Sequence, residues 1–391
     1  KNFSLRETEP GNRKFHLSKA YDMLPVNVIM PEDQEQLALT INGKKRNIHR
    51  KEFLILAESC GLMPKVAEHI IAKVCGLKEK FLKQVDEAYL SENQKEKVKE
   101  LFQKMEVYYL ANKTKNLYFA VLGDCSESDV KDEKFDKEVE EEGLKEVKRL
   151  NAKYSTQNGF PIFHFIYRER QYNKKEDKYL GWERKRGLLT QFNEFILKHE
   201  KNKFKVNTIE QNEIPTIKYV ITLDSDTELI LNSAFELIGA MAHILNKPVI
   251  DDKRNIVIDG YGIMQPRVGI NLDISYKTLF TKIFAGAGGI DNYTNAISDV
   301  YQDNFGEGIF TGKGIYDVEV FSKVLKEEIP ENKVLSHDLL EGSYLRCGLV
   351  TDIMIMDGYP TKYASFMNRL ARWTRGDWQI IGWLNNKKLN K

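Results

Sequence analysis

The sequence of 391 residues has little net charge, few cysteines and no long apolar run. Its formal net charge of +2 gives no electrostatic reason to expect nucleic acid or an anionic membrane surface as a partner. The four cysteines are scattered without the paired spacing of a metal site, so we expect free thiols in a reducing compartment: Cys60, Cys75, Cys125 and Cys347.

Membrane and export signals are absent from the sequence as well. No apolar stretch approaches the roughly 20 residues that a membrane-spanning helix needs. The longest candidate, FELIGAMAHIL, is interrupted by Glu236 and His243 and is predicted to form a buried amphipathic helix. The opening KNFSLRETEP lacks the apolar core of a signal peptide. These absences predict a cytoplasmic chain, unless a region outside it supplies an anchor.

The pattern of apolar residues divides the chain into three stretches. Residues 1–103 begin with a short extended segment and continue as helices, predicted in HRKEFLILAESCGL, PKVAEHIIAKVCGL and SENQKEKVKELFQKM. Residues 104–200 are mixed, with strands expected in NLYFAVLGD and FPIFHFIYRER around a charged, solvated helix. From residue 201 strands and helices alternate, which predicts an α/β layer architecture with a largely parallel sheet.

Two aspartates follow one of these predicted strands. In IKYVITLDSD the apolar run from Ile217 to Leu223 suits a buried strand, and Asp224 and Asp226 come at its end. Side chains two apart in an extended chain point the same way, so the two carboxylates can converge. Carboxylates are the ligands that hard divalent cations prefer, and a diphosphate could complete the shell. The alternative is a helix cap beside a solvated acid.

Several further stretches accompany this one in a fixed order. Residues from about 104 to 384 resemble the glycosyltransferase region of cyclic β-1,2-glucan synthases, relatives of processive family 2 enzymes such as cellulose synthase. The stretches that carry the resemblance are MEVYYLANKTKNLYFAVLGD, GWERKRGLLTQFNEFIL, YVITLDSDTEL, GYGIMQPRV, FGEGIFTGKGIYDV, SHDLLEGSYLRCGLVTDI and RLARWTRGDWQI. The resemblance implies a GT-A fold, that is, a Rossmann-like mixed sheet flanked by helices. It also implies a UDP-glucose donor, a divalent metal (Mg or Mn) and inversion at the anomeric carbon.

The resemblance assigns roles to individual residues. Asp224 and Asp226 match the aspartates that bind the nucleotide and the metal. Asp338 in SHDLLEG matches the general base, which must reach the acceptor hydroxyl and take its proton. The RLARW stretch matches the motif over the diphosphate and the acceptor end, where arginine forks pair phosphate oxygens and an indole ring stacks on sugar: Arg369, Arg372 and Trp373.

Basic and glycine residues complete the implied site. Lys185, Arg186 and Gly187 resemble the element that meets the nucleotide. The segment GEGIFTGKG resembles a glycine-rich acceptor segment, where bare backbone permits close approach of the sugar: Gly306, Gly308, Gly312 and Gly314.

Each of these residues also has a purely structural interpretation. Asp338 could cap a helix, the arginines could be solvated, Trp373 could belong to the core, and the glycines could be turn residues. Lys185 and Arg186 lie in a charge cluster of the kind usually found at a surface. His337 and His164 show no partner spacing and are interpreted as structural. The functional interpretation rests on the ordered set.

The expected pattern departs from the family at both ends. The strand and helix that normally open this fold, and supply part of the base pocket, are expected to be missing, as are the membrane helices that follow. We expect the helix SENQKEKVKELFQKM to pack in place of the transferase's own first helix. In the resembled family the enzyme works at the cytoplasmic face of the inner membrane with a growing glucan as acceptor.

Residues 1–103 carry a second resemblance, to the C-terminal part of HipA-type serine/threonine kinases, in the stretch from KNFSLRETEP to HRKEFLILAESCGL. Asn2 and Asp22 fit that family's metal-binding positions. Phosphoryl transfer also needs a catalytic-loop aspartate and an ATP-cradling lobe, which would precede Lys1, so kinase activity is not expected. Three functions therefore compete: a glucosyltransferase module impaired by truncation or not, a kinase-derived binding module, and an inactive fusion.

Overall fold

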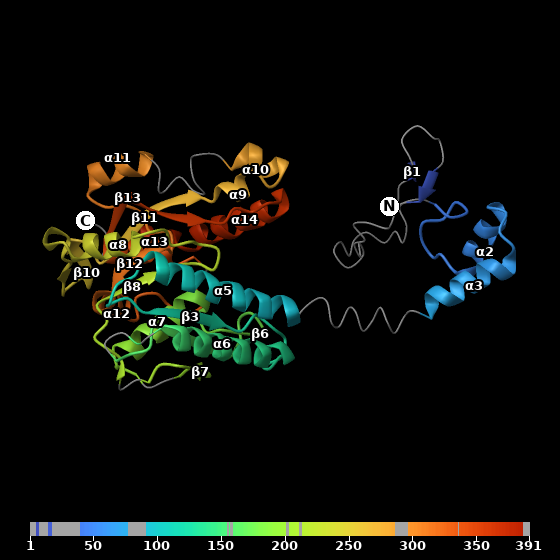
Figure 1. Cartoon of the computed structure of the whole chain (residues 1–391). Helices are drawn as coiled ribbons and strands as arrows, with labels where there is room; N and C mark the ends of the chain where they lie inside the picture. Colours follow the sequence, from blue (N-terminus) through green and yellow to red (C-terminus); the bar gives the residue numbers. More distant parts are fainter. Residues whose placement is uncertain are drawn as a thin grey trace. The chain divides into compact units, whose positions relative to one another are not determined.

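The computed structural model of the protein describes residues 5–7, 15–17, 40–76, 91–154, 156, 159–200, 203–210, 213–285, 296–334 and 336–385. The chain divides into two compact units, Lys1–Tyr89 and Leu90–Lys391. Figure 1 shows the elements of each unit, whose relative positions are not determined. Each unit is therefore considered by itself.

The first unit contains a short hairpin and a helix pair. Strands β1 (Leu5–Glu7) and β2 (Phe15–Leu17) pair antiparallel, and the helices are α2 (Arg50–Ser59) and α3 (Pro64–Cys75). Helix α2 begins where Glu52 accepts a hydrogen bond from the backbone N–H of His49 at 2.8 Å. The predicted extended start and both predicted helices are confirmed.

The second unit is a mixed α/β structure. Its first half contains α5 (Ser91–Ala111), β3 (Phe119–Asp124), α6 (Lys134–Lys153), β4 (Phe163–Arg168), β5 (Gln171–Asn173), β6 (Lys178–Leu180), α7 (Arg184–Ile196) and β7 (Val206–Asn207). Its second half contains β8 (Tyr219–Thr222), α8 (Ser233–Ala242), η2 (Ile244–Asn246), β9 (Val249–Asp251), β10 (Ile256–Asp259), β11 (Ile263–Ile270), α9 (Leu272–Ser275), α10 (Leu279–Phe284), α11 (Ala296–Phe305), β12 (Gly314–Asp317), α12 (Val318–Leu325), α13 (Asp338–Leu345), β13 (Cys347–Asp357), α14 (Tyr363–Gln379) and η4 (Ile381–Asn385).

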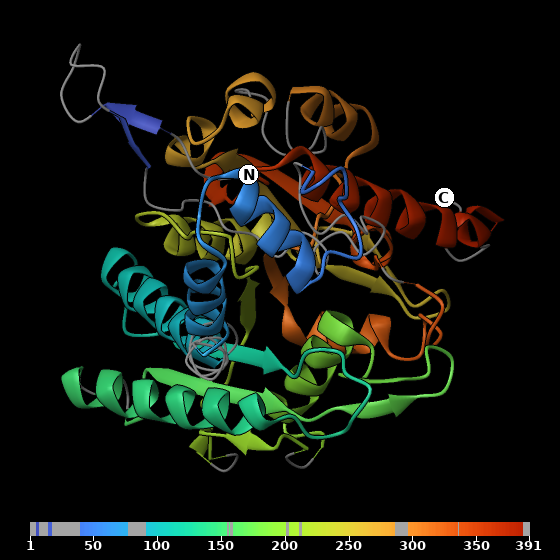
Figure 2. The ribbon, with the colours of Figure 1, turned by 90° about the vertical axis from the view of Figure 1, so that its right-hand side faces the viewer.

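Two small sheets organise this unit. In the first, β4 lies between β3 and β7, parallel to β3 and antiparallel to β7. In the second the order is β13-β11-β12-β8, and only β11 and β13 are parallel. The prediction of a largely parallel sheet from residue 201 onward is therefore wrong, although the mixed α/β character of the chain is confirmed. In Figure 2, α6 runs near the bottom of the second unit and α14 runs through its upper half, below the orange helices, with strands between α6 and α14.

Helix α5 belongs to the core of the second unit. It packs beside α6 (Figure 1). Lys95 Nζ on α5 lies 3.3 Å from Glu138 Oε2 on α6. Phe102 is fully buried against the ring of Phe165, at 6.0 Å between centroids. The boundary expected near residue 103 falls inside this helix, and the compact units divide before it. That α5 stands in for another helix stays a prediction.

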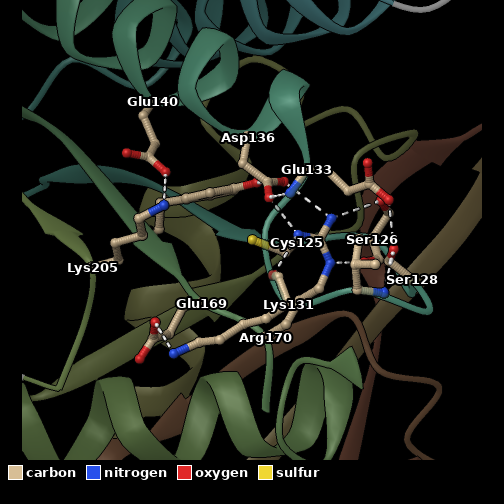
Figure 3. A network of polar contacts seen from close by, with 12 residues as sticks. Cys125, Ser126, Ser128, Lys131, Glu133, Asp136, Glu140, Glu169, Arg170 and Lys205 are labelled. Carbon is tan, nitrogen blue, oxygen red and sulfur yellow. Dashed lines mark hydrogen bonds and ion pairs between the residues drawn. The ribbon is translucent and has the colours of Figure 1, made fainter. Parts of the chain in front are cut away.

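A polar network joins the carboxyl ends of β3 and β4 to the start of α6 (Figure 3). The guanidinium of Arg170 donates to the Asp136 carboxylate and to the carbonyls of Ser126 and Lys131, at 2.5 and 3.2 Å. Both charges of the Arg170–Asp136 pair are buried, so removing one partner would leave the other uncompensated. Burial raises the pKa of the nearby Cys125 thiol to about 11, which keeps it protonated and unreactive.

The structure describes the four cysteines and the longest apolar stretch of the sequence. All four cysteines are free thiols, with Cys60 and Cys75 exposed and Cys125 and Cys347 buried. Among the described residues no helix has the length and apolar character to span a membrane. The FELIGAMAHIL stretch forms α8 and η2. Leu237 is buried and Phe235 exposed on α8, as expected for an amphipathic helix.

Candidate functional site

The aspartate turn follows strand β8. Asp224 lies two residues after the last strand residue, and the backbone N–H of Thr227 donates to its carbonyl at 3.0 Å. The end of β13 runs alongside, because the N–H of Gly358 donates to the carbonyl of Asp226 at 3.1 Å. The predicted strand is confirmed, but it ends before the aspartates, which lie in a turn. The extended geometry expected to align their side chains therefore does not apply.

Two lysines from different elements reach Asp224. Lys185, near the start of α7, donates to Asp224 Oδ1 at 2.5 Å and to the carbonyl of Gly312 at 2.8 Å. Lys313 Nζ lies 3.5 Å from Asp224 Oδ2. Burial alone would raise the pKa of Asp224, but the two ammonium groups outweigh it and hold the pKa below its ordinary value. Asp224 is therefore ionised and already neutralised by protein cations.

A third carboxylate completes this group from the end of β13. Asp357 is almost fully buried, forms an ion pair with Lys313 and accepts a hydrogen bond from Thr227 Oγ1 at 2.8 Å. Burial, then the nearby charge of Asp357, raises the pKa of Asp226. The turn therefore faces a third acid that the sequence analysis did not include.

The proposed base Asp338 lies beside Gly312. Asp338 is the first residue of α13 and is partly buried. A Cβ added at Gly312 would lie 2.8 Å from Asp338 Oδ1, and Gly312 has a φ of +87°, which side chains rarely adopt. Since the carbonyl of Gly312 also accepts the Lys185 hydrogen bond, one glycine links the surroundings of Asp224 to those of Asp338.

His337 has partners that the sequence analysis missed. Its Nδ1 lies 2.7 Å from Glu341 Oε1 and 3.6 Å from Asp338 Oδ1. Burial lowers the pKa of His337, but the carboxylates of Glu341 and Asp338 more than compensate, so the pKa is raised. The spacing of one helical turn between His337 and Glu341 was the signal for this pair. These three side chains also offer ligand atoms within 4.8 Å of one another, a geometry that a metal ion could use.

Helix α14 brings the arginine–tryptophan motif to the same region. The Arg369 guanidinium lies 4.9 Å from the Trp373 ring centroid and 5.8 Å from that of Tyr359. Burial lowers the pKa of Arg369, and the charges of Asp357 and Asp226 offset part of this decrease. Among the described residues its Nε and Nη2 have no hydrogen-bond partner. Arg372 is exposed on the same helix.

Other expected site residues point elsewhere. Arg186 donates to Glu183 and, at 3.2 Å, to the carbonyl of Ile329. Gly187 lies close to the carbonyl of Trp182. In the glycine-rich segment, added Cβ atoms would meet Arg346 at Gly306, Leu349 at Gly308 and the Met264 carbonyl at Gly314, so these glycines fit close backbone packing. Asn2 and Asp22 lie outside the described residues.

Asp224, Asp226 and Asp357 offer carboxylate oxygens that a divalent cation could use, although among the described residues only His337, Asp338 and Glu341 bring three ligand atoms within 4.8 Å of one another. In the part of the chain that the structure describes, no other residue donates a hydrogen bond to the Asp226 carboxylate, and Asp224 and Asp357 supply further oxygens nearby. Hard cations such as Mg²⁺ and Mn²⁺ take such oxygens. Asp226 could hold the ion outright, whereas Asp224 and Asp357 are shared with lysines.

One curated protein gives the chain a relative. The chain is 43% identical over 293 residues to the cyclic β-(1,2)-glucan synthase NdvB of Rhizobium meliloti (strain 1021). The alignment covers 74% of this chain and 10% of that protein, so the chain spans about a tenth of its relative's length. No protein-family model matches the chain. The identity supports the family to which the sequence motifs point.

Proposed function

We propose that the second unit is a glycosyltransferase module of glucan synthesis with a GT-A fold, which moves glucose from UDP-glucose to a growing β-1,2-glucan with inversion. The observation that carries this proposal is the convergence of the site around Gly312. Lys185 donates to Asp224 and to the carbonyl of Gly312, and a Cβ added at Gly312 would lie 2.8 Å from Asp338 Oδ1. The identity to a cyclic β-glucan synthase supports the choice of sugar chemistry.

The reaction needs a base on the acceptor and positive charge on the leaving group. Asp338 takes the proton of an acceptor hydroxyl while that oxygen bonds to the anomeric carbon and the bond to the diphosphate breaks. Lys185 and the Arg369 N–H groups that have no partner among the described residues hold the departing diphosphate, and Trp373 stacks on a sugar face. A divalent metal bound by Asp226 and Asp224 would add charge at the diphosphate.

A binding and turnover experiment tests this function. Calorimetric titration of UDP-glucose with Mn²⁺ should show binding that Asp226→Asn abolishes or weakens strongly. Asp338→Asn should keep that binding but lower kcat by a factor of about 100 or more, because the general base is lost. The measurement is radiolabelled glucan formed from UDP-glucose. A folded protein that binds no UDP-glucose would refute the proposal.

The kinase-derived alternative predicts a different ligand. If the first unit were a HipA-like binding module, ATP rather than UDP-glucose would bind in the same titration. Binding of neither nucleotide would favour an inactive fusion.

A further inference from the structure

Lys313 is one of the cations in contact with the aspartate turn, and its side chain is largely buried. Its side chain is 13% exposed, against 35% for Lys185. Its ammonium group forms an ion pair with Asp357, whose side chain is 1% exposed, and lies 3.5 Å from Asp224 Oδ2. It is therefore placed between two carboxylates that come from the ends of different strands, β8 and β13.

A divalent cation bound by Asp224 and Asp357 would occupy the position that the Lys313 ammonium group takes. Asp357 and Asp224 lie within ion-pair distance of the Lys313 ammonium, and the nearby charge of Asp226 also acts to raise the pKa of Lys313. Thr227 Oγ1 holds the second oxygen of Asp357 and fixes the carboxylate toward the lysine. A divalent ion that used Asp224 or Asp357 would have to displace the ammonium, and two cations so close together would repel each other in a partly buried site.

The balance of charges at the site also indicates that protein cations take the place of a metal ion. Asp224, Asp226 and Asp357 stand opposite Lys185, Lys313 and Arg369, all of which interact with at least one of these acids. The surroundings of a metal ion are thus already neutralised. A diphosphate changes this balance, because its negative charge gives the ammonium of Lys313 a new partner and frees carboxylate oxygens.

We propose that Lys313 is a built-in cation that competes with the divalent metal for Asp224 and Asp357, and so makes metal binding depend on the nucleotide diphosphate. The inference rests on the proposed function, since it assumes that the turn binds a metal–diphosphate pair. Metal and UDP then strengthen each other's binding, and Lys313 sets part of that coupling.

The test measures Mn²⁺ affinity by electron paramagnetic resonance, with and without UDP, on the full chain. Wild type binds Mn²⁺ weakly alone and more tightly with UDP. Lys313→Met should raise the affinity for Mn²⁺ alone by about tenfold and shrink the gain that UDP brings. Lys313→Arg keeps the charge and should behave like wild type. Lys323→Met removes a lysine of the exposed pair with Asp252 and should change nothing.

The outcomes separate the inference from the proposed function. If Lys313→Met leaves the affinity for Mn²⁺ alone unchanged or lowers it, while wild type still binds Mn²⁺ with UDP, the inference is overturned and the proposed function stands. If wild type binds no UDP under any condition, both are refuted. If Lys313→Met does not melt cooperatively, Lys313→Gln replaces it, because glutamine can still donate a hydrogen bond to Asp357. The same tenfold rise in the affinity for Mn²⁺ alone is then expected of Lys313→Gln.

Discussion

His164 is a buried histidine whose protonation opposes folding. It lies in β4, 2% exposed, with Nε2 2.9 Å from the Pro161 carbonyl. Burial lowers its pKa from 6.5 to about 4. The unfolded chain therefore binds a proton first as the pH falls, and stability that is fully present above pH 6.5 is lost towards pH 4. The loss between pH 7 and 5 should be about 2 kcal/mol.

Urea unfolding between pH 7 and 5 measures this loss. His164→Gln should remove that part of the pH dependence, because glutamine does not titrate. His69→Gln changes an exposed histidine of the first unit and serves as the control. An equally steep pH dependence in His164→Gln and wild type would contradict the assignment.

The residues of the site differ in how far the sequence could predict them. Asp224, Asp338 and Arg369 were found because each lies in a motif that can be read along the chain. Lys313 and Asp357 were not found, because their contact joins residues 44 positions apart, at the ends of strands that are not neighbours in the sheet. The spacing of Lys313 and Asp357 along the sequence does not indicate that they are in contact. Glu341 could have been predicted as the partner of His337, because it lies one helical turn after that residue.

Phe102 tests the place of α5 in the second unit. Its ring is fully buried between α5 and β4, so Phe102→Ala should leave a cavity and destabilise this unit by about 3–5 kcal/mol in urea unfolding. Val107→Ala, on the same helix but 58% exposed, should cost less than about 0.5 kcal/mol. Equal effects of the two substitutions would show that α5 does not pack as described.

Elements were predicted better than their pairing. The helices predicted in residues 91–105 and 127–154 correspond to α5 and α6, and the apolar runs of β3 and β4 identified those strands, because these patterns are local properties. Strand direction is not local. Alternating strands and helices suggested parallel strands, whereas β12 pairs antiparallel to both β11 and β8. Helices α9, α10 and α11 lie between β11 and β12 in the chain, and the two strands are antiparallel all the same.

At the scale of the whole molecule, the division into two units predicts that the first unit can be removed without unfolding the second. Every proposed transferase residue lies between Lys185 and Trp373, and the described hydrophobic clusters draw their residues from Val98 onward. Removing residues 1–89 should therefore leave the melting of the second unit and its affinity for UDP-glucose with Mn²⁺ within about twofold of the full chain. A chain lacking residues 1–111 also loses α5, whose buried side chains Phe102, Met105 and Tyr109 cover the first sheet, and should not melt cooperatively. If the shorter truncation kept its fold but lost UDP-glucose binding, the first unit would have to contribute to the site, and the assignment of donor binding to the second unit alone would be wrong.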